Sequence, residues 1–162
     1  MKRFLRSAVT ALLFLLVLPL RSAGGKPDVP PRELADRIIE AAMLYIGSPY
    51  QYHAVGPNAF DCSGFTSYVY RQMGYTNIGA SSRDQYARNI PVSRSEMKRG
   101  DLVFFSSPNS GRGVGHVGIV VDVDPITRTF NFIHASTSEG VKISNSSEGF
   151  YARRFIGVRR VL

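Results

Sequence analysis

The chain contains a single cysteine and three histidines, and three of these four side chains could form a nucleophilic site. Cys62 cannot make an intramolecular disulfide, so it is either an inert buried side chain or a reactive thiol. A thiol nucleophile needs a base within hydrogen-bond reach and a third group that orients the base. We assign His116 as the base and His134 as its orienter, because both fall in segments patterned as neighbouring strands. In this arrangement His134 accepts the Nδ1–H of His116.

Cys62 stands where a loop turns into a helix. Apolar residues follow it at four-residue spacing, and a glycine marks the predicted end of the helix: Phe65, Val69, Met73 and Gly74. Asp61 is in position to cap this helix. The sulfur would then lie in the first turn, where free backbone N–H groups and the helix dipole favour a thiolate.

A predicted hairpin places the two histidines. Residues 114–122 and 129–135 have strand-like alternation, and residues 124–127 have the composition of a turn. Small neighbours leave room around the imidazole of His116, and His134 shares a strand face with two phenylalanines. Pairing through the turn would bring both histidines toward one end of the hairpin.

Each of these residues also has a simpler interpretation. A lone cysteine is more often inert than catalytic, and a histidine on a strand is usually structural. Cys62, His116 and His134 could instead hold zinc, but ligand pairs at close spacing are absent. We therefore expect no metal and no organic cofactor, and the joint placement of the three residues favours nucleophilic catalysis.

Other polar residues near the cysteine have two interpretations each. Asp61 and Ser63 flank Cys62 and either cap the helix or contact a substrate. His53 lies in the preceding loop, where exposure to solvent is expected, although it could reach the cleft. Asp101 precedes a predicted strand and is expected to cap a turn.

The wider pattern predicts helices first and antiparallel strands second. Helical spacing covers 32–46, 62–73 and 81–89, and strand-like patterns cover 101–105, 114–122, 129–135, 141–144 and 155–161. This order predicts an α+β domain in which N-terminal helices pack on a C-terminal antiparallel sheet.

The first 25 residues have the pattern of a secretory signal peptide: a basic start, an apolar stretch and a small-residue exit. An uncleaved anchor is the alternative, although the apolar stretch is shorter than the roughly 20 residues that span a bilayer. No cysteine lies near the cleavage zone, so we expect no lipid anchor. The expected organisation is a signal peptide at 1–25, an extended leader at 26–34 and one domain at 35–162, exported to the periplasm or secreted.

Removal of the signal peptide lowers the formal charge from +8 to +4, because four of the 20 Lys and Arg residues leave with it and none of the 12 Asp and Glu residues does. Some remaining basic residues cluster near the C-terminus: Arg153, Arg154, Arg159 and Arg160. No nucleic-acid-binding module is recognisable, so we expect no nucleic-acid partner. Affinity for an acidic polymer outside the cytoplasm and an ordinary solvated surface are the two interpretations.

Four short motifs occur in an order that resembles the NlpC family, bacterial cell-wall cysteine peptidases with a papain-like core. They are residues 61–65 (DCSGF), 99–105 (RGDLVFF), 116–119 (HVGI) and 134–136 (HAS). The resemblance covers roughly residues 35–162. Segments 136–141 and 159–162 look most like the small murein endopeptidases of Gram-negative bacteria.

The resemblance implies that Cys62 is the nucleophile, His116 the base and His134 the third polar residue. It also implies a role for Tyr50, which stands 12 residues before the cysteine. Its hydroxyl would bind the developing oxyanion together with the backbone N–H of Cys62, and Tyr52 is the alternative.

The resemblance extends to the residues beside the nucleophile, with one departure. Asp61 and Ser63 match positions that in some subgroups receive the free amine of the substrate. Family members usually carry Gly-Gly shortly after the tyrosine, whereas this chain has His53 and Ala54. Substrate preference is therefore open, because that loop borders the cleft.

The implied activity is hydrolysis of an amide bond in peptidoglycan stem peptides by a monomeric enzyme. The bond is either the crosslink between D-alanine and meso-diaminopimelate or the γ-D-glutamate–meso-diaminopimelate bond within a stem. Two alternatives from other classes stay open: a catalytically silent wall-binding module, and a cysteine-dependent amidase or acyltransferase on lipid-like substrates. An apolar groove beside Cys62 would favour the acyltransferase, and a polar, open groove would favour peptidoglycan.

Overall fold

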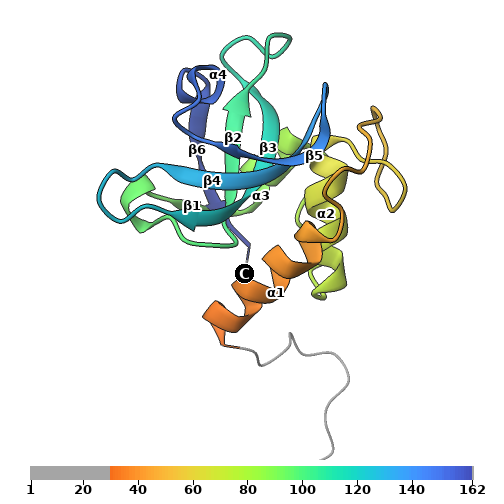
Figure 1. The fold of residues 1–162 in the computed structure, drawn as a ribbon, viewed down its shortest axis with the longest axis horizontal. Coiled ribbons are helices and arrows are strands. Elements are labelled where there is room, and N and C mark those ends of the chain that lie inside the picture. Colours follow the sequence, from red (N-terminus) through yellow and green to blue (C-terminus); the bar gives the residue numbers. More distant parts are fainter. Residues whose placement is uncertain (1–29, 162) are drawn as a thin grey trace, which may run out of the picture.

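Six strands between residues 30 and 161 form one antiparallel sheet, in the order β1-β6-β2-β3-β4-β5 (Figure 1). The computed structural model describes residues 30–161, so the predicted signal peptide lies outside the described residues. The strands are β1 (Ile90–Val92), β2 (Leu102–Ser106), β3 (Val114–Val123), β4 (Phe130–Ser136), β5 (Gly140–Asn145) and β6 (Phe155–Arg160). Five of them match predicted strands within two residues at either end. The sequence did not predict β1, because three residues that include a proline carry little strand signal.

Helices precede the sheet, as predicted for an α+β domain. They are α1 (Pro31–Met43), α2 (Cys62–Gln72) and α3 (Ser82–Arg88), and the 3-10 turn η1 (Arg94–Glu96) and the short α4 (Gly149–Ala152) lie between strands. Helix α1 begins at Pro31, one residue before the predicted helical spacing of 32–46, and its first turn therefore overlaps the end of the predicted leader 26–34. Proline is favourable there because the first helical N–H needs no intrahelical acceptor.

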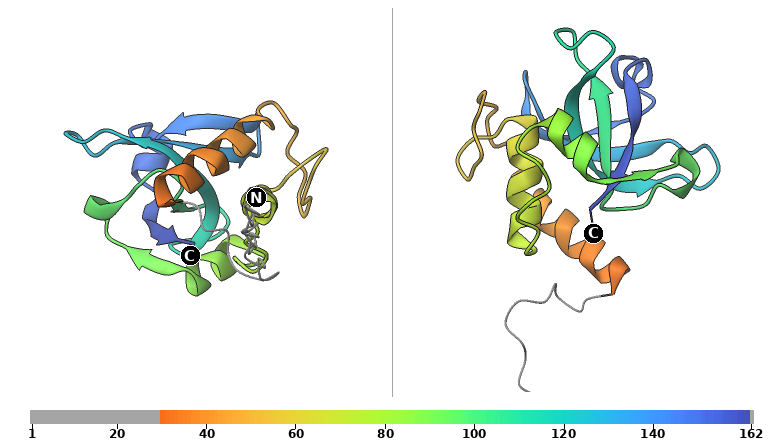
Figure 2. Two further views of the ribbon diagram at one scale, coloured as in Figure 1. Left: turned by 90° about the horizontal axis from the view of Figure 1, so that it is seen from below. Right: turned by 180° about the vertical axis from the view of Figure 1, so that it is seen from behind.

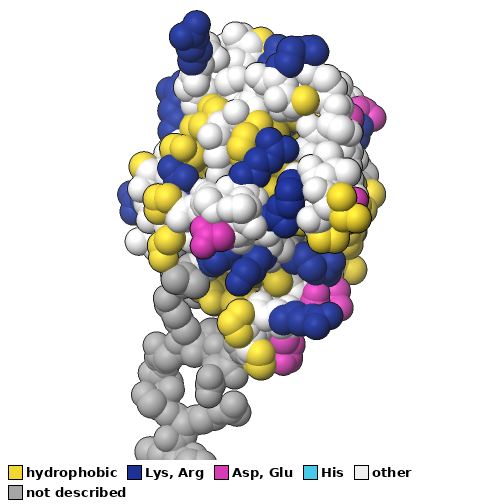
Figure 3. All heavy atoms as spheres, turned by 90° about the vertical axis from the view of Figure 1, so that its left-hand side faces the viewer, with side chains coloured by type: hydrophobic (Ala, Val, Ile, Leu, Met, Phe, Trp, Pro, Cys, Tyr) yellow, Lys and Arg dark blue, Asp and Glu magenta, His cyan; other side chains and the backbone are white. Residues whose placement is uncertain are grey.

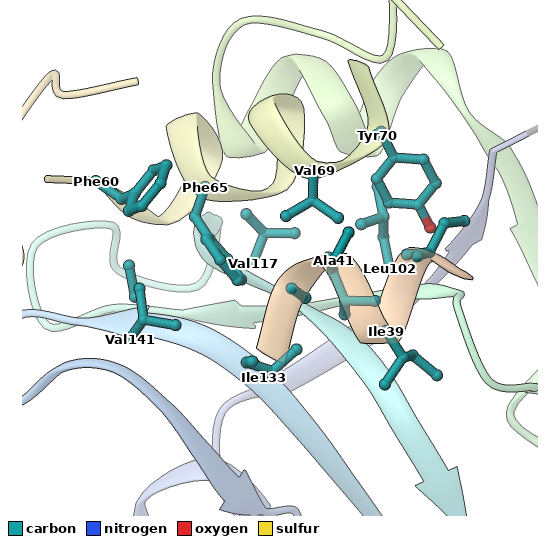
Figure 4. Packing of buried hydrophobic residues seen from close by; sticks show 14 of the residues in the cluster. Ile39, Ala41, Phe60, Phe65, Val69, Tyr70, Leu102, Val117, Ile133 and Val141 are labelled. Atoms are coloured by element: carbon teal, nitrogen blue, oxygen red, sulfur yellow. The ribbon is translucent and has the colours of Figure 1, made fainter. Parts of the chain in front are cut away.

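Helices α1 and α2 lie on the same side of the sheet and bury their apolar faces against it (Figure 2). The four-residue spacing after Cys62 is confirmed, since Phe65 and Val69 are fully buried. Figure 4 shows these two side chains beside Val117 of β3 and Ala41 of α1. This packing fixes the start of α2 relative to the middle strands of the sheet.

A second apolar cluster lies on the opposite face of the sheet. Phe105, Val120 and Phe132 are fully buried there, and Tyr151 of α4 packs against them. The alternation predicted for β3 is confirmed, because Val120 joins this cluster while Val117 and Ile119 join the cluster under the helices.

The arginines near the C-terminus take part in intramolecular contacts. Arg160 forms a bidentate ion pair with buried Asp101, with both N–O distances at 2.8 Å, and Arg159 lies 3.5 Å above the ring of Tyr86. Asp101 also accepts the backbone N–H of Lys98, which confirms its predicted turn-capping role. On the face drawn in Figure 3, Lys and Arg side chains are dispersed among apolar patches rather than gathered in one place.

No helix between residues 30 and 161 is both long enough and apolar enough to cross a membrane.

Candidate active site

Asp61 caps the helix that begins at Cys62. Its Oδ1 accepts the backbone N–H of Gly64 at 2.6 Å and the hydroxyl of Ser63 at 2.9 Å. The predicted N-cap is confirmed, and the carboxylate satisfies one of the free N–H groups of the first turn. Capping therefore accounts for both residues that flank the cysteine.

The loop before the cysteine packs tightly against the first turn of α2. The backbone N–H of Asp61 donates to the carbonyl of Ala54 at 2.8 Å. A Cβ atom added at Gly64 would lie 2.1 Å from the same carbonyl oxygen. Glycine at this position lets the loop pack directly on the first turn of α2. The contact between Ala54 and Gly64 therefore fixes the loop next to Cys62.

Gln85 of α3 holds the other side of this turn. Its side chain is fully buried; it accepts the hydroxyl of Thr66 at 2.8 Å and donates to the carbonyl of Ser63 at 3.0 Å. The sequence analysis missed this residue. The signal was available in the predicted helix 81–89, where a glutamine on the inward face needs buried partners.

His116 and His134 form a direct pair across β3 and β4. The Nε2 of His116 lies 2.8 Å from the Nδ1 of His134, and the two rings are nearly perpendicular. The predicted meeting of the histidines is confirmed, but the ring nitrogen is not the predicted one. Because Nε2 of His116 faces His134, Nδ1 is the nitrogen left for the thiol.

Two hydroxyl groups lie behind His134. Its Nε2 is 3.1 Å from the Oγ of Ser144 and 3.3 Å from the hydroxyl of Tyr151. Burial raises the pKa of Tyr151, and the nearby hydroxyl of Ser144 lowers it less strongly. Either hydroxyl oxygen can accept the Nε2–H of His134. Neither residue was predicted from the sequence, because neither a strand serine nor the four-residue α4 stands out by pattern.

Cys62 is held against β3 at the residue that follows His116. The backbone N–H groups of Val117, Ser63 and Cys62 itself lie near the sulfur and lower the pKa of the thiol. Burial and the charge of Asp61 outweigh them and raise the pKa to about 11. The expected stabilisation of a thiolate is therefore wrong, because the effect of burial on the pKa is larger than the opposing effect of the backbone N–H groups at the helix start.

Both histidines are neutral in the folded protein. Burial lowers the pKa of His116 to about 4. Burial, and then the neighbouring charges of His116 and Lys142, lower the pKa of His134 to about 2. The resting site at neutral pH therefore holds a thiol and two neutral imidazoles.

A cleft of about 380 Å³ opens in front of the sulfur. Most of the residues that line it have polar side chains, and the full lining is Tyr50, Tyr52, His53, Asp61, Cys62, Ser63, Ala80, Ser81, Ser82, Arg83, Ser107, Asn109, Ser110, Val114 and Gly115. Tyr50, Asp61 and Ser63, which the sequence analysis singled out, thus share one cavity with Cys62. His116 and His134 are not among the lining residues, and the wall next to His116 is formed by Val114 and Gly115.

Tyr50 and His53 occupy different parts of this cleft. Tyr50 is half-buried, and its pKa is raised first by burial and next by the charge of Cys62, which places the phenol beside the thiol. His53 is exposed at the rim, where its ring stacks on Tyr52 at 4.0 Å, and Tyr52 is itself 74% exposed. His53 has a left-handed φ of 63°, a conformation that favours glycine, and it stands where the related family usually has one.

Among residues 30–161, no three His, Cys, Asp or Glu side chains are grouped as metal ligands. The inner nitrogens of His116 and His134 face each other, so they are not directed together at a third atom.

A papain-like α+β fold with a cysteine at a helix start beside paired strand histidines defines a class of cysteine hydrolases. The chain belongs to the NlpC/P60 family, whose model matches residues 47–160.

Similar proteins come from several bacteria. A probable endopeptidase of Corynebacterium glutamicum (strain R) is 40% identical over 114 residues, which cover 70% of this chain and 50% of that protein. The murein DD-endopeptidase MepS/murein LD-carboxypeptidase of Escherichia coli (strain K12) is 33% identical over 130 residues, 80% of this chain and 64% of MepS. The crystal structure of the NlpC/p60 domain of the peptidoglycan hydrolase SagA matches with a TM-score of 0.64 and 33% identity, over 78% of this chain and 98% of that one. This chain thus spans less than two thirds of the length of both curated relatives.

Proposed function

We propose that this protein is an exported cysteine endopeptidase that hydrolyses an amide bond of peptidoglycan stem peptides. The observation that carries the proposal is the position of Cys62 at the start of α2, close to the backbone of Val117 in β3, which is the residue that follows His116 of the His116–His134 pair, in a cleft lined mostly by residues with polar side chains. Membership of a family that includes murein endopeptidases supports the substrate class.

The first step forms a tetrahedral intermediate directly from the neutral thiol and the neutral imidazole, without a resting thiolate. The sulfur of Cys62 attacks the carbonyl carbon while its proton passes to Nδ1 of His116. The positive charge that forms on His116 is shared with His134 through the Nε2–Nδ1 hydrogen bond. The carbonyl π electrons move to oxygen, where the hydroxyl of Tyr50 and the backbone N–H of Cys62 are the proposed donors.

The tetrahedral intermediate then collapses. The C–N bond breaks, and His116 gives its proton to the leaving amine, which leaves a thioester on Cys62. A water molecule attacks the thioester carbonyl as His116 takes its proton. The C–S bond breaks, the carboxylic acid leaves, and the thiol regains a proton from His116.

The cleft lining bears on the alternatives. A lipid-like acyl substrate would need an apolar groove beside the sulfur, whereas serines, Asn109 and Arg83 line this one. A silent wall-binding module would need site residues that do not meet, whereas the two histidines are in direct contact.

Purified peptidoglycan is the substrate for the test, digested by the purified protein beside its Cys62→Ala variant. Mass spectrometry of the released muropeptides identifies the products. Loss of crosslinked dimers with wild type alone supports cleavage of the D-alanine–diaminopimelate crosslink, and shortened stems support cleavage after γ-D-glutamate. Equal products from both proteins, or none from either, would overturn the proposal.

We also propose that residues 1–25 direct export. N-terminal sequencing of the protein recovered from a periplasmic or culture fraction tests this. A mature start near residue 26 supports export, and an intact start in the cytoplasmic fraction contradicts it.

A further inference from the structure

The cleft beside Cys62 has one fixed positive charge. Of the described residues that line it, Arg83 is the only lysine or arginine, and Asp61 is the only aspartate or glutamate. One oxygen of the Asp61 carboxylate, Oδ1, accepts the N–H of Gly64 and the hydroxyl of Ser63. The ion pairs of residues 30–161 involve other basic residues, so Arg83 is not neutralised by a protein carboxylate.

Arg83 is anchored in a way that leaves part of its guanidinium group unused. Its Nε donates to the backbone carbonyl of Val114 at 3.1 Å, which ties α3 to the first residue of β3. Within residues 30–161, its two terminal nitrogens donate no hydrogen bond. The neighbouring acidic residue, Asp84, forms its ion pair with Arg88 and not with Arg83. An exposed guanidinium held at Nε therefore offers its terminal N–H groups to the cleft.

We propose that Arg83 is a substrate-binding residue that recognises a free carboxylate of the stem peptide next to the cleaved amide. This inference rests on the proposed function and deepens it. A planar guanidinium whose orientation is already fixed matches a carboxylate with two parallel N–H···O hydrogen bonds. Stem peptides carry such carboxylates on diaminopimelate and on D-isoglutamate, the residues that flank the two bonds considered above.

The charge of the cleft explains why a carboxylate is the fitting ligand. An amide at the same place would still accept a hydrogen bond but would lose the ionic contribution. A carboxylate in the cleft without Arg83 would meet the negative charge of Asp61 and no opposing cation. Arg83 should therefore make the protein distinguish free from amidated stem peptides.

The test compares soluble muropeptides that differ only in amidation. One pair carries diaminopimelate with a free or an amidated carboxyl group, and a second pair carries D-isoglutamate or D-isoglutamine. We expect wild type to have a roughly 10- to 100-fold higher kcat/KM for the free form in one of the two pairs. The pair that shows the difference identifies which carboxylate Arg83 binds.

Arg83→Gln should lower kcat/KM on the free form by the same factor and leave the amidated form within about threefold, and Arg83→Lys should retain part of the preference. Arg88→Gln is the matched control, because it removes an arginine of the same helix that lies outside the cleft lining. If Arg83 had a purely structural role, Arg83→Gln would lower kcat/KM equally for the free and the amidated peptides. That result, or a wild type indifferent to amidation in both pairs, would overturn the inference.

Binding separates this inference from the proposed function. Calorimetric titration of the Cys62→Ala protein with the same peptides reads the carboxylate preference without turnover. If wild type cleaves nothing but the preference in binding exists and disappears with Arg83→Gln, the carboxylate site stands and the enzymatic proposal fails. If wild type cleaves all peptides with no preference in rate or binding, the enzyme stands and the carboxylate site fails.

Discussion

The Nε2 of His116 and the Nδ1 of His134 lie 2.8 Å apart, and His134 is fully buried. Only one proton can lie between these two nitrogens. If it belongs to His116, the Nδ1 of His116 is an unprotonated base and Nε2 of His134 must carry a proton toward Ser144. If it belongs to His134, the base is blocked.

Because the two histidines have different proposed roles, we expect their alanine variants to lose different amounts of activity. We expect His116→Ala to reduce kcat on peptidoglycan by roughly 10³-fold, because the group that moves the proton is gone. His134→Ala should cost roughly 10- to 100-fold, since an orienter contributes less than the base. Steady-state rates on a soluble muropeptide measure both. Equal losses for the two variants would contradict the assigned roles, provided circular dichroism shows both folded.

The hydroxyl of Ser144 is expected to select the productive tautomer of His134. Ser144→Ala removes the nearer of the two hydroxyl acceptors for Nε2–H and leaves the Tyr151 hydroxyl at 3.3 Å, so a larger share of His134 should carry its proton on Nδ1. Nitrogen-15 NMR of the imidazoles reports this directly, and kcat should fall by about threefold to tenfold. Ser146→Ala is the control, because that buried serine bonds the backbone N–H of Phe130 and touches no histidine. Unchanged imidazole spectra in Ser144→Ala would rule out the tautomer role.

Acid should destabilise the fold through the same two residues. Burial lowers the pKa of His116 to about 4 and that of His134 to about 2, whereas an unfolded histidine titrates near 6.5. Below pH 6.5 the two histidines are therefore protonated in the unfolded chain but not in the folded protein, and the free energy of unfolding falls as the pH falls. Each histidine contributes up to about 1.4 kcal/mol per pH unit between pH 6 and pH 4.

Denaturant unfolding at several pH values measures this slope. His134→Gln should lower it by about one proton relative to wild type. The other ionisable groups are common to both proteins, so the difference isolates His134. An unchanged slope in His134→Gln would show that the buried pair does not govern acid stability.

The sequence predicted the fold and the chemistry-bearing residues where periodicity or a cap determines the outcome. The helix at Cys62 followed from Asp61 and the spacing of apolar residues, and the meeting of the histidines followed from two alternating strands and a turn. The ionisation of the thiol was predicted wrongly, because burial depends on the loop and on β3, which local pattern does not place.

The residues that the sequence did not reveal act through long-range contacts. Gln85 and Ser144 are polar side chains that become informative only when tertiary packing supplies their partners. Arg83 carried no signal because an arginine near a helix start is ordinary until the cleft around it is known.

Gly64 is expected to tolerate no side chain. Alanine in an open helix is favoured over glycine by about 1 kcal/mol, but here its Cβ would lie 2.1 Å from the carbonyl oxygen of Ala54. We expect Gly64→Ala to destabilise the protein by about 2 kcal/mol and to displace Cys62. Gly149→Ala is the control, because its Cβ would meet only the flexible end of Arg153. Thermal unfolding that shows no loss for Gly64→Ala would contradict the tight contact.

His53 and Ala54 allow a test of the backbone at the cleft rim. His53 has a φ of 63°, which costs a residue with a side chain about 1 kcal/mol or more, whereas Ala54 is not among the residues with positive φ. His53→Gly should therefore be more stable than His53→Ala by about 1 kcal/mol, while Ala54→Gly should lose a similar amount. Opposite signs at adjacent positions distinguish relief of strain from a general effect of glycine on the unfolded chain. Denaturant unfolding of the three variants measures both differences, and the same sign at both positions would mean that the rim is not strained at His53. If the expected signs hold, only the first glycine of the usual family pair serves the backbone, and this chain places an aromatic ring at the cleft rim at that energetic cost.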